Sequence, residues 1–373
     1  MRKSVAIIGT RGYPSYYGGF ETLVRVLAPY LVERNWDVVV YGRKGAVQHD
    51  DKSINTRVRS VETLGIESKS LSTLSYGFSS VLHSSVVKPD VALVMNVANG
   101  YWLPLLRARN VPTVVNVDGI EWERDKWGAN ARRVFKGGAS MTAKFGDELV
   151  FDSMEIAKRW GEDFRRSGTY IAYGGVDPGP LDAVEGLVAG EYILIVARFV
   201  PENTVGEFLE AAAVLSRDFD IVIVGSSGYG GELDLAVQKL ADSSSRVRWL
   251  GHVSDDAKLF SLWKNCGLYF HGHSVGGTNP ALVQAMACGA PILARDTVFN
   301  REVLDDSAEF VEPDSGAIVA AATKLMKDPE NRLAMGRASA VRGRSHYTWQ
   351  QVCSEYENVL LATIAGKMSG VEF

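Results

Sequence analysis

The sequence predicts an α/β protein of two consecutive domains, each built on a doubly wound parallel sheet. Three observations support this fold class. The chain has 373 residues, about twice the length of a typical single domain. Short apolar runs alternate with amphipathic segments from end to end, which is the pattern of parallel βαβ units. A segment dense in turn residues, Gly174–Pro180, divides these runs into two series.

The short apolar runs are the predicted strands. In the first series they lie at residues 5–8, 37–41, 58–61, 91–95, 113–117, 149–151 and 169–172, and in the second at 192–196, 221–224, 247–250, 268–270 and 291–294. We place an N-terminal domain at 1–174, a C-terminal domain at 175–345, and a last helix, over 350–364, within 346–373. Ligands of parallel sheets bind beyond the carboxyl ends of the strands, so we expect a cleft that both domains share.

Composition argues against several classes of protein. The formal net charge of −4 gives no reason to expect nucleic acid as a partner. Cys266, Cys288 and Cys353 lack the spacing of metal ligands, and this usage fits a reducing cytoplasm. No stretch approaches the roughly 20 apolar residues that a membrane span needs. We therefore expect any membrane contact to be peripheral.

The first candidate motif is the glycine-rich loop after the first strand, Gly9–Pro14, which continues to Gly18, Gly19 and Glu21. Glycine allows backbone N–H groups to approach an anion at the start of the following helix. The loop lacks Gly-Lys-Ser/Thr and Gly-x-Gly-x-x-Gly, and no acidic residue ends the second strand, so a dinucleotide site is not favoured. Arg43 after that strand leaves an NADP alternative open.

The second motif is its counterpart in the C-terminal domain, His273–Pro280, followed by a helix rich in small residues. Pro280 suits the first turn of a helix. Backbone N–H groups of Gly276, Gly277, Thr278 and Asn279 are predicted to form a cradle for a diphosphate. The alternative is a tight turn with no ligand.

Two charged residues follow predicted strands. Arg198 follows the first strand of the C-terminal domain, and a guanidinium suits a diphosphate because it stays charged and offers fork-shaped donors. Asp118 follows the strand at 113–117 and is the best-placed carboxylate of the N-terminal domain. A surface arginine and a helix cap are the respective alternatives.

Several motifs occur in a recognisable order along the whole chain: Gly-Gly-Phe-Glu, Arg-Phe-Val-Pro-Glu-Asn, Val-Gly-Ser-Ser-Gly, Trp-Leu-Gly-His-Val and Ala-Met-Ala-Cys-Gly. Together they resemble the retaining glycosyltransferases of family four, which have the GT-B fold of two Rossmann-like domains facing a central cleft. Thr-Arg-Gly-x-Pro and His-Ser-Val-Gly-Gly-Thr-Asn-Pro narrow the resemblance to a bacterial rhamnosyltransferase-like branch that builds capsule and exopolysaccharide. The resemblance also implies that the C-terminal helix crosses back to the N-terminal domain.

The resemblance implies roles for matching residues. Gly18 and Gly19 would approach the donor diphosphate from the N-terminal domain, while Arg198 and the 276–279 backbone bind it from the other. Main chain near Val253 would contact the base. Asp118 takes the place where the wider family often has a donor-contacting His.

Three departures from the wider family accompany these roles. The Glu-x7-Glu pair of the family falls on Gly276 and Gln284, and its diphosphate-binding Lys falls on Asn203. Loss of that Lys concentrates the demand for positive charge on Arg198 and the backbone amides. Gln284 is expected to bind one ribose hydroxyl, which agrees with the 2′-deoxyribose of a dTDP-sugar.

These observations lead to an expected function. The chain would transfer a hexosyl group, specifically L-rhamnosyl from dTDP-L-rhamnose, to a hydroxyl of a polyprenyl-linked saccharide, with no cofactor and no metal. It would work in the cytoplasm at the inner face of the plasma membrane, with surface Arg132, Arg133 and Lys136 meeting anionic lipid. Two alternatives remain: a nucleotide-sugar epimerase of the same fold, and a non-catalytic nucleotide-sugar-binding protein, which the lost glutamates favour.

Overall fold

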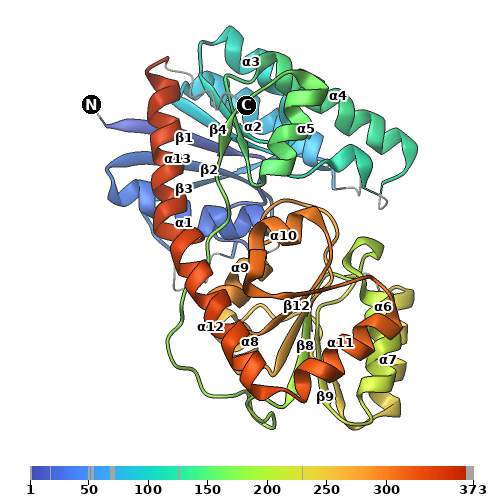
Figure 1. The fold of residues 1–373 in the computed structure, drawn as a ribbon. Helices are drawn as coiled ribbons and strands as arrows, with labels where there is room; N and C mark the ends of the chain where they lie inside the picture. Colours follow the sequence, from blue (N-terminus) through green and yellow to red (C-terminus); the bar gives the residue numbers. More distant parts are fainter. Residues whose placement is uncertain are drawn as a thin grey trace. The chain divides into compact units, whose positions relative to one another are not determined.

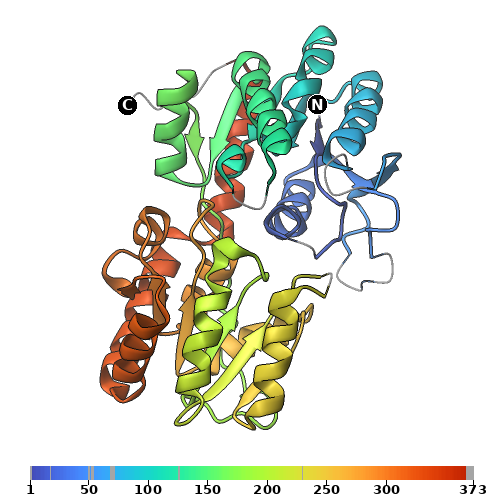
Figure 2. The ribbon, with the colours of Figure 1, turned by 90° about the vertical axis from the view of Figure 1, so that its right-hand side faces the viewer.

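The computed structural model describes residues 2–16, 18–48, 51, 54–67, 72–124, 127–228 and 230–366. The chain forms two compact units, the first of Met1–Ala172 with Trp349–Phe373 and the second of Tyr173–Thr348. Each unit contains one parallel sheet with helices on both of its faces (Figures 1 and 2). The predicted fold class, two Rossmann-like parallel-sheet domains, is confirmed.

The first unit has a seven-stranded sheet in the order β3-β2-β1-β4-β5-β6-β7. Its strands are β1 (Lys3–Ile8), β2 (Trp36–Arg43), β3 (Arg59–Thr63), β4 (Val91–Met95), β5 (Thr113–Asn116), β6 (Glu148–Phe151) and β7 (Thr169–Tyr170). Its helices are α1 (Gly19–Glu33), α2 (Ser72–Val87), α3 (Leu103–Ala108), α4 (Ala129–Phe145), α5 (Met154–Phe164) and α13 (Trp349–Ile364), with short 3₁₀ turns at Val97–Trp102 and Glu121–Glu123.

The second unit has a six-stranded sheet in the order β10-β9-β8-β11-β12-β13. Its strands are β8 (Tyr192–Val196), β9 (Asp220–Val224), β10 (Val247–Trp249), β11 (Leu268–His271), β12 (Ile292–Arg295) and β13 (Glu309–Val311). Its helices are α6 (Val205–Leu215), α7 (Glu232–Ser243), α8 (Asp256–Asn265), α9 (Pro280–Ala287), α10 (Val298–Leu304), α11 (Ser315–Met326) and α12 (Pro329–His346), with 3₁₀ turns at Pro201–Asn203 and Asp305–Ser307.

Burial explains why these strands were visible in the sequence. Every residue of β4 is buried, and in β8 the first four residues are buried, as expected for a parallel sheet covered on both faces. The sequence did not predict β13. Its Glu309 is exposed and its Phe310 is half-buried, and such a short edge strand has no continuous apolar run. The edge strand β3 is mostly polar and runs to Thr63, two residues past its predicted end at 61.

The C-terminal helix α13 belongs to the first unit, as the fold prediction stated (Figure 1). It packs against α1 and against β4 and β5. The Trp36 indole N–H donates to Glu357 of α13 at 3.0 Å. The unit boundaries after Ala172 and Thr348 lie within a few residues of the expected ones after 174 and 345.

The order of each sheet reverses at its centre, between β1 and β4 in the first unit and between β8 and β11 in the second. Such a switch point separates the two loops that follow its strands and leaves a crevice where ligands bind. The Gly9–Pro14 loop follows β1 at the first of these points, and Asp118 follows β5 beside it. Arg198 and the 273–280 motif follow β8 and β11, the two strands of the second. Among the described residues, no helix is long and apolar enough to cross a membrane.

Candidate functional site

The switch point of the second unit brings two predicted motifs together. β8 pairs in parallel with β11, so the loops that follow both strands leave the sheet at the same edge. The loop after β8 carries Arg198, and the loop after β11 carries the glycine pair Gly276 and Gly277. Both loops belong wholly to this unit.

Hydrogen bonds join the two loops directly. The backbone N–H and hydroxyl of Ser274 both donate to the carbonyl of Glu202, at 2.9 and 2.8 Å. The Thr204 hydroxyl donates to the carbonyl of Gly272 at 2.6 Å and accepts from Arg295, at the end of β12, at 3.0 Å. These bonds fix the loops relative to each other, as a preorganised binding site requires.

The backbone around Arg198 is fixed by hydrogen bonds, and the Arg198 side chain is exposed. The N–H of the next residue, Phe199, donates to Ser226 at 3.1 Å, and the side-chain amide of Asn203 donates to the Arg198 carbonyl at 2.9 Å. Asn203, which stands where the wider family has Lys, therefore supports the Arg198 backbone and adds no charge. Arg198 stays a predicted diphosphate ligand.

The first turn of α9 has few backbone N–H groups left for a ligand. Pro280 has no N–H, and the N–H of Ala281 donates to the side chain of the N-cap residue Asn279 at 3.0 Å. The Asn279 side-chain oxygen is thus used by the helix cap, whereas its amide nitrogen and backbone N–H are the donors that can face a diphosphate. Gly276 has a φ of +103°, a conformation that favours glycine, and Thr278 is buried. The predicted cradle is thus confined to the loop 276–279 rather than to the helix end.

A pair of stacked histidines lies beside this loop, and the sequence did not single it out. The His271 ring is buried, meets the Tyr269 hydroxyl at 3.0 Å, and stacks on His273 with ring centroids 4.5 Å apart. Burial, followed by the neighbouring charge of His273, holds the pKa of His271 well below its usual range. His271 is therefore a neutral support for the end of β11.

Gln284 has a different partner from the ribose that the sequence predicted. Its side-chain oxygen accepts from the Val176 N–H at 3.0 Å, and its nitrogen donates to the Val176 carbonyl at 2.7 Å and meets the Cys288 sulfur at 3.4 Å. The side chain is buried. Both polar atoms of the amide already have protein partners, so Gln284 supports the Val176 backbone, and its contact with a ribose stays a prediction.

Val253 lies in the loop after β10 and is half-buried. The loops after β9 and β10 are tied together, because the Gly225 N–H donates to the Gly251 carbonyl at 2.7 Å and the Trp249 indole donates to the Gly225 carbonyl at 2.9 Å. This places the main chain near Val253 at the same edge of the sheet as Arg198. Its contact with a base stays a prediction.

In the first unit, Gly18 is the extended N-cap of α1 and Gly19 is its first residue. The start of this helix already holds a carboxylate, because Glu21 is buried in the first turn and accepts from the Arg11 N–H at 3.0 Å. The helix N-terminus stabilises the negative charge of Glu21. The same charge would repel a diphosphate bound next to it. Gly18 and Gly19 can therefore bind a diphosphate, as predicted, only if its phosphates lie away from the Glu21 carboxylate.

Asp118 follows β5 and is held from two sides. Its carboxylate accepts from the Asn96 side chain, at the end of β4, at 3.2 Å, and its N–H donates to the Asn116 side chain at 3.0 Å. The Asn116 amide in turn donates to the Tyr356 hydroxyl of α13 at 2.7 Å. Asp118 has a φ of +63°, which costs free energy in a non-glycine residue. Asn96, Asn116 and Tyr356 were not predicted, because only the fold brings them to Asp118.

Asp218-Phe219-Asp220 has the spacing of an Asp-x-Asp metal motif, but its position does not suit the site. Asp220 begins β9 and pairs with Arg246 at 3.2 Å. It lies at the amino end of the strand, whereas Arg198 and the 276–279 loop lie at the carboxyl ends. This acidic pair is therefore on the opposite edge of the same sheet.

The chain matches two protein families. Residues 185–342 match "Glycosyl transferases group 1", and residues 2–176 match "Domain of unknown function (DUF1972)". The first match contains Arg198 and the whole 273–280 motif. The second covers the glycine-rich loop and Asp118.

The relatives and solved structures that resemble the chain agree with these matches. A phosphatidyl-myo-inositol mannosyltransferase of Mycolicibacterium smegmatis is 29% identical over 234 residues, which cover 58% of this chain and 58% of that protein. The sucrose-phosphate synthase of Thermosynechococcus elongatus has a TM-score of 0.81 at 17% identity and covers 98% of this chain and 100% of its own. Anabaena HepE in complex with UDP-glucose has a TM-score of 0.73 at 14% identity, with 96% and 99% covered.

Proposed function

From the match of residues 185–342 to the family "Glycosyl transferases group 1", we propose that this chain is a retaining glycosyltransferase. It moves a hexosyl group from a nucleoside diphosphate sugar to a hydroxyl of a lipid-linked saccharide. The observation that carries the proposal is the joining of the Arg198 loop to the 272–279 loop through Ser274 and Glu202, inside the part of the chain that matches the family.

The chemical difficulty of this reaction is the negative charge that builds on the leaving diphosphate. The exposed guanidinium of Arg198 and the backbone N–H groups of 276–279 are the groups of this unit that meet that charge. A preorganised donor of this kind can lower the barrier by about 3 kcal/mol. Because Asn203 stands where the wider family has a lysine, Arg198 supplies the positive charge that stabilises the leaving diphosphate.

Asp118 is proposed to orient the transferred sugar or the acceptor hydroxyl. Its carboxylate is fixed by Asn96, and its strained backbone by Asn116. A side chain held in this way loses little further freedom when substrate binds, which favours the reacting geometry.

The proposed donor is dTDP-L-rhamnose. Support for this sugar comes from the two motifs Thr-Arg-Gly-x-Pro and His-Ser-Val-Gly-Gly-Thr-Asn-Pro, whereas the curated relative is named a mannosyltransferase and the solved neighbour holds UDP-glucose. Gln284 no longer supports the choice of base, since it pairs with Val176. A thermal-shift panel of dTDP-rhamnose, GDP-mannose and UDP-glucose tests the donor, because a ligand at about 100 times its dissociation constant adds about 2.7 kcal/mol of stability. Stabilisation by GDP-mannose alone would exclude rhamnose.

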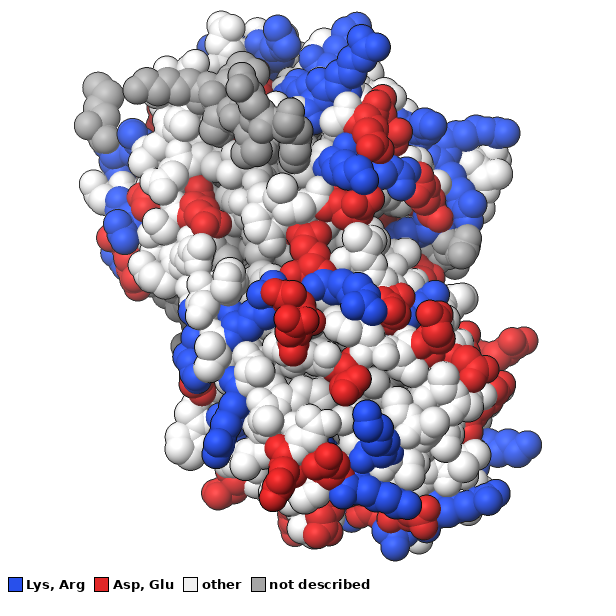
Figure 3. Space-filling model, viewed as in Figure 1, with Lys and Arg blue, Asp and Glu red and all other residues white. Residues whose placement is uncertain are grey.

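A peripheral contact with anionic membrane is part of the proposal, because the acceptor is lipid-linked. Figure 3 shows Lys and Arg side chains gathered where Figure 1 places α3 and α4, and the Arg133 and Lys136 side chains of α4 are exposed. On α2 of the same unit, Phe78, Leu82 and Val86 are exposed at four-residue spacing, which puts them on one face of the helix. Co-sedimentation with anionic but not neutral vesicles is expected, and no lipid association at low salt would contradict it.

A further inference from the structure

A second arginine of the C-terminal unit, which the sequence did not single out, stands at the end of β12. Arg295 is the last residue of that strand, and β12 pairs in parallel with β11. Arg295 therefore leaves the sheet at the same edge as Arg198 and the 276–279 loop. All three belong to the second unit.

The Arg295 side chain is bonded to the junction of the two loops that form the candidate site. Its Nη1 donates to the Thr204 hydroxyl at 3.0 Å, and that hydroxyl donates to the Gly272 carbonyl at 2.6 Å. The two loops are in close contact at this point, because a Cβ at Gly272 would lie 2.5 Å from the Asn203 carbonyl. The guanidinium thus lies where the loop after β8 meets the loop after β11.

A second connection fixes the backbone of Arg295 beside the same loops. The Asn300 side-chain amide donates to the His273 carbonyl at 2.9 Å and to the Arg295 carbonyl at 2.8 Å. Asn300 is buried. The loops after β8, β11 and β12 are therefore bonded to one another, as a preorganised site requires.

The Arg295 guanidinium has no acidic partner among the described residues. The carboxylate next to it in sequence, Asp296, is committed to Arg301, which donates to both of its oxygens at 2.6 Å. These hydrogen bonds lower the pKa of Asp296. The buried carboxylate of Glu202, in the loop after β8, does not pair with Arg295 either, since its Oε2 has no hydrogen-bond partner.

Most donors of the Arg295 guanidinium are open to a ligand. A guanidinium has five N–H donors, and within the described part of the chain Arg295 has one bond, from Nη1 to Thr204. Neither Nε nor Nη2 is buried. The group is thus fixed at one corner and keeps a planar fork of donors, which matches two oxygens of a phosphate.

The order of the strands indicates which part of a donor Arg295 would meet. The sheet runs β10-β9-β8-β11-β12-β13, with about 4.8 Å between neighbouring strands. The predicted base contact near Val253 follows β10, Arg198 follows β8, and Arg295 ends β12. A nucleotide sugar laid along this edge would pass Arg198 first. The bond to Thr204 directs the Arg295 guanidinium back toward the loop after β8, so it would meet the phosphate farther from the nucleoside.

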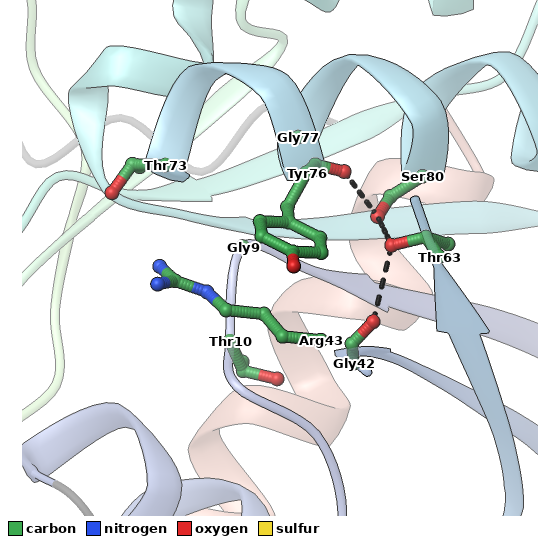
Figure 4. Close-up of a pocket in the computed structure, with 9 residues that line it drawn as sticks. All are labelled: Gly9, Thr10, Gly42, Arg43, Thr63, Thr73, Tyr76, Gly77 and Ser80. Atoms are coloured by element: carbon green, nitrogen blue, oxygen red, sulfur yellow. Dashed lines mark hydrogen bonds between the residues drawn. The ribbon is translucent and has the colours of Figure 1, made fainter. Parts of the chain in front are cut away.

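An arginine at a strand end of the first unit does not offer the same setting. Arg43 lies over the Tyr76 ring, 5.3 Å from the ring centroid, beside a pocket at the ends of β1, β2 and β3 (Figure 4). The cavity there is about 10 Å³, which is room for about one water. Burial lowers the pKa of Arg43, whereas the carboxylates of Glu67 and Glu21 raise it. Arg43 thus has neither the space nor the uncompensated charge that a phosphate needs.

We propose that Arg295 is a second ligand of the donor diphosphate and binds the phosphate that carries the sugar. Asn203 stands where the wider family has a lysine, and Arg295 supplies a second positive charge beside Arg198 from a different strand. This inference rests on the proposed function for the identity of the ligand.

Calorimetric titration with nucleotides tests this contact without turnover. The probes are dTDP, UDP and GDP, each compared with its monophosphate, which lacks the second phosphate. Arg295→Gln should weaken the best-bound diphosphate about 10- to 100-fold, the range for hydrogen bonds to a charged group, and leave its monophosphate unchanged. Arg295→Lys keeps the charge but loses the fork, so its affinity for the diphosphate should lie between wild type and Arg295→Gln. Arg217→Gln, an exposed arginine before β9 in the same unit, should change neither probe.

Two outcomes would overturn the role of Arg295. The first is an unchanged affinity for the diphosphate in Arg295→Gln with the melting temperature of wild type. The second is equal weakening of diphosphate and monophosphate, which would reduce Arg295 to a support for the Thr204 loop. The variant should fold, because the Thr204 hydroxyl keeps its bond to Gly272. If it does not fold, wild-type affinity for the diphosphate in Arg295→Lys would overturn the proposed fork.

The same titrations separate this proposal from the proposed function. A wild-type protein that binds none of the three nucleoside diphosphates would reject the nucleotide-sugar site and Arg295 as its ligand together. Binding that falls selectively in Arg295→Gln sustains the contact even in a protein that transfers no sugar, and then only the glycosyltransferase activity is rejected.

Discussion

The side-chain amide of Asn116 donates a hydrogen bond of 2.7 Å to the hydroxyl of Tyr356. The bond joins the end of β5 to the C-terminal helix α13, across 240 positions of sequence. The same Asn116 side chain accepts from the Asp118 N–H. Through Asn116, a residue near the end of the chain thus holds the loop that carries the candidate carboxylate.

Tyr356 is therefore expected to act as a positioning residue for Asp118. Tyr356→Phe leaves the Asn116 amide buried without a partner, which costs about 1–3 kcal/mol of stability. It should also lower kcat about tenfold or more with little change in the KM for the donor, because misplacement of a reacting group slows chemistry more than binding. Glu357→Ala on the same helix, which removes the bond to Trp36, is the control. A similar loss of kcat in both variants would reduce Tyr356 to a structural role.

Arg198→Ala should lower turnover more than it weakens donor binding. The charge that Arg198 meets grows toward the transition state, so we expect kcat to fall about 100-fold and the donor KM to change much less. The side chain is exposed, so the melting temperature should stay at the wild-type value. Steady-state kinetics with varied donor checks this. A raised KM with unchanged kcat would mean that the 276–279 backbone does the catalytic part.

Gln284→Ala should destabilise the second unit rather than change the choice of nucleotide base. The substitution removes the partners of both backbone groups of Val176, and we expect a loss of about 1–3 kcal/mol in urea denaturation. Gln238→Ala is the matched control, because Gln238 is exposed on α7 and bonds Asp242 on the same helix. Unaltered stability together with a changed preference between dTDP- and UDP-sugars would restore the predicted ribose contact.

His271 should make the fold less stable in acid. Burial holds its pKa in the folded protein well below the usual range, whereas in the unfolded chain it titrates near about 6.5. As the pH falls below that value the unfolded chain binds a proton that the folded chain refuses, so unfolding becomes easier by up to about 1.4 kcal/mol per pH unit. His271→Gln should flatten this part of the stability curve between pH 6.5 and 5. An identical curve in the variant would show that His271 is protonated in the fold.

Metal independence is a further prediction. The proposed stabilisation of the leaving diphosphate by Arg198 and backbone amides requires no cation, and the Asp218–Asp220 pair lies on the other edge of the sheet. We expect full activity in excess EDTA. Activity that disappears in EDTA and returns only with Mg²⁺ or Mn²⁺ would contradict this, and Asp220→Asn would then identify whether that pair is involved.

Local signals in the sequence were sufficient for the fold. A strand such as β4, buried on both faces, leaves an uninterrupted apolar run, and alternation with amphipathic segments is enough to predict parallel βαβ units. β13 escaped because a strand at the sheet edge needs no such run. The order of the motifs also located the two loops that the structure joins through Ser274 and Glu202.

The roles of single side chains were less accessible, because each depends on a partner far along the chain. Gln284 pairs with a backbone 108 positions away, so a comparison of glutamine with glutamate at the ribose could not reveal its partner. Arg43 was considered only as a ligand of a ribose phosphate. Its position over the Tyr76 ring becomes visible only when β2, α2 and the loop after β1 are assembled around it.

The central claim is transfer of a sugar from a nucleoside diphosphate to a lipid-linked saccharide, and its most direct test is the mass of the acceptor after incubation with each donor sugar. The account predicts that purified protein adds one hexosyl unit, a deoxyhexosyl unit when dTDP-rhamnose is used, with release of one nucleoside diphosphate per product. Arg198→Ala should form the same product at a far lower rate. A donor that is bound or consumed while the acceptor mass never changes, across the whole panel, would contradict the claim and leave an epimerase or a binding protein.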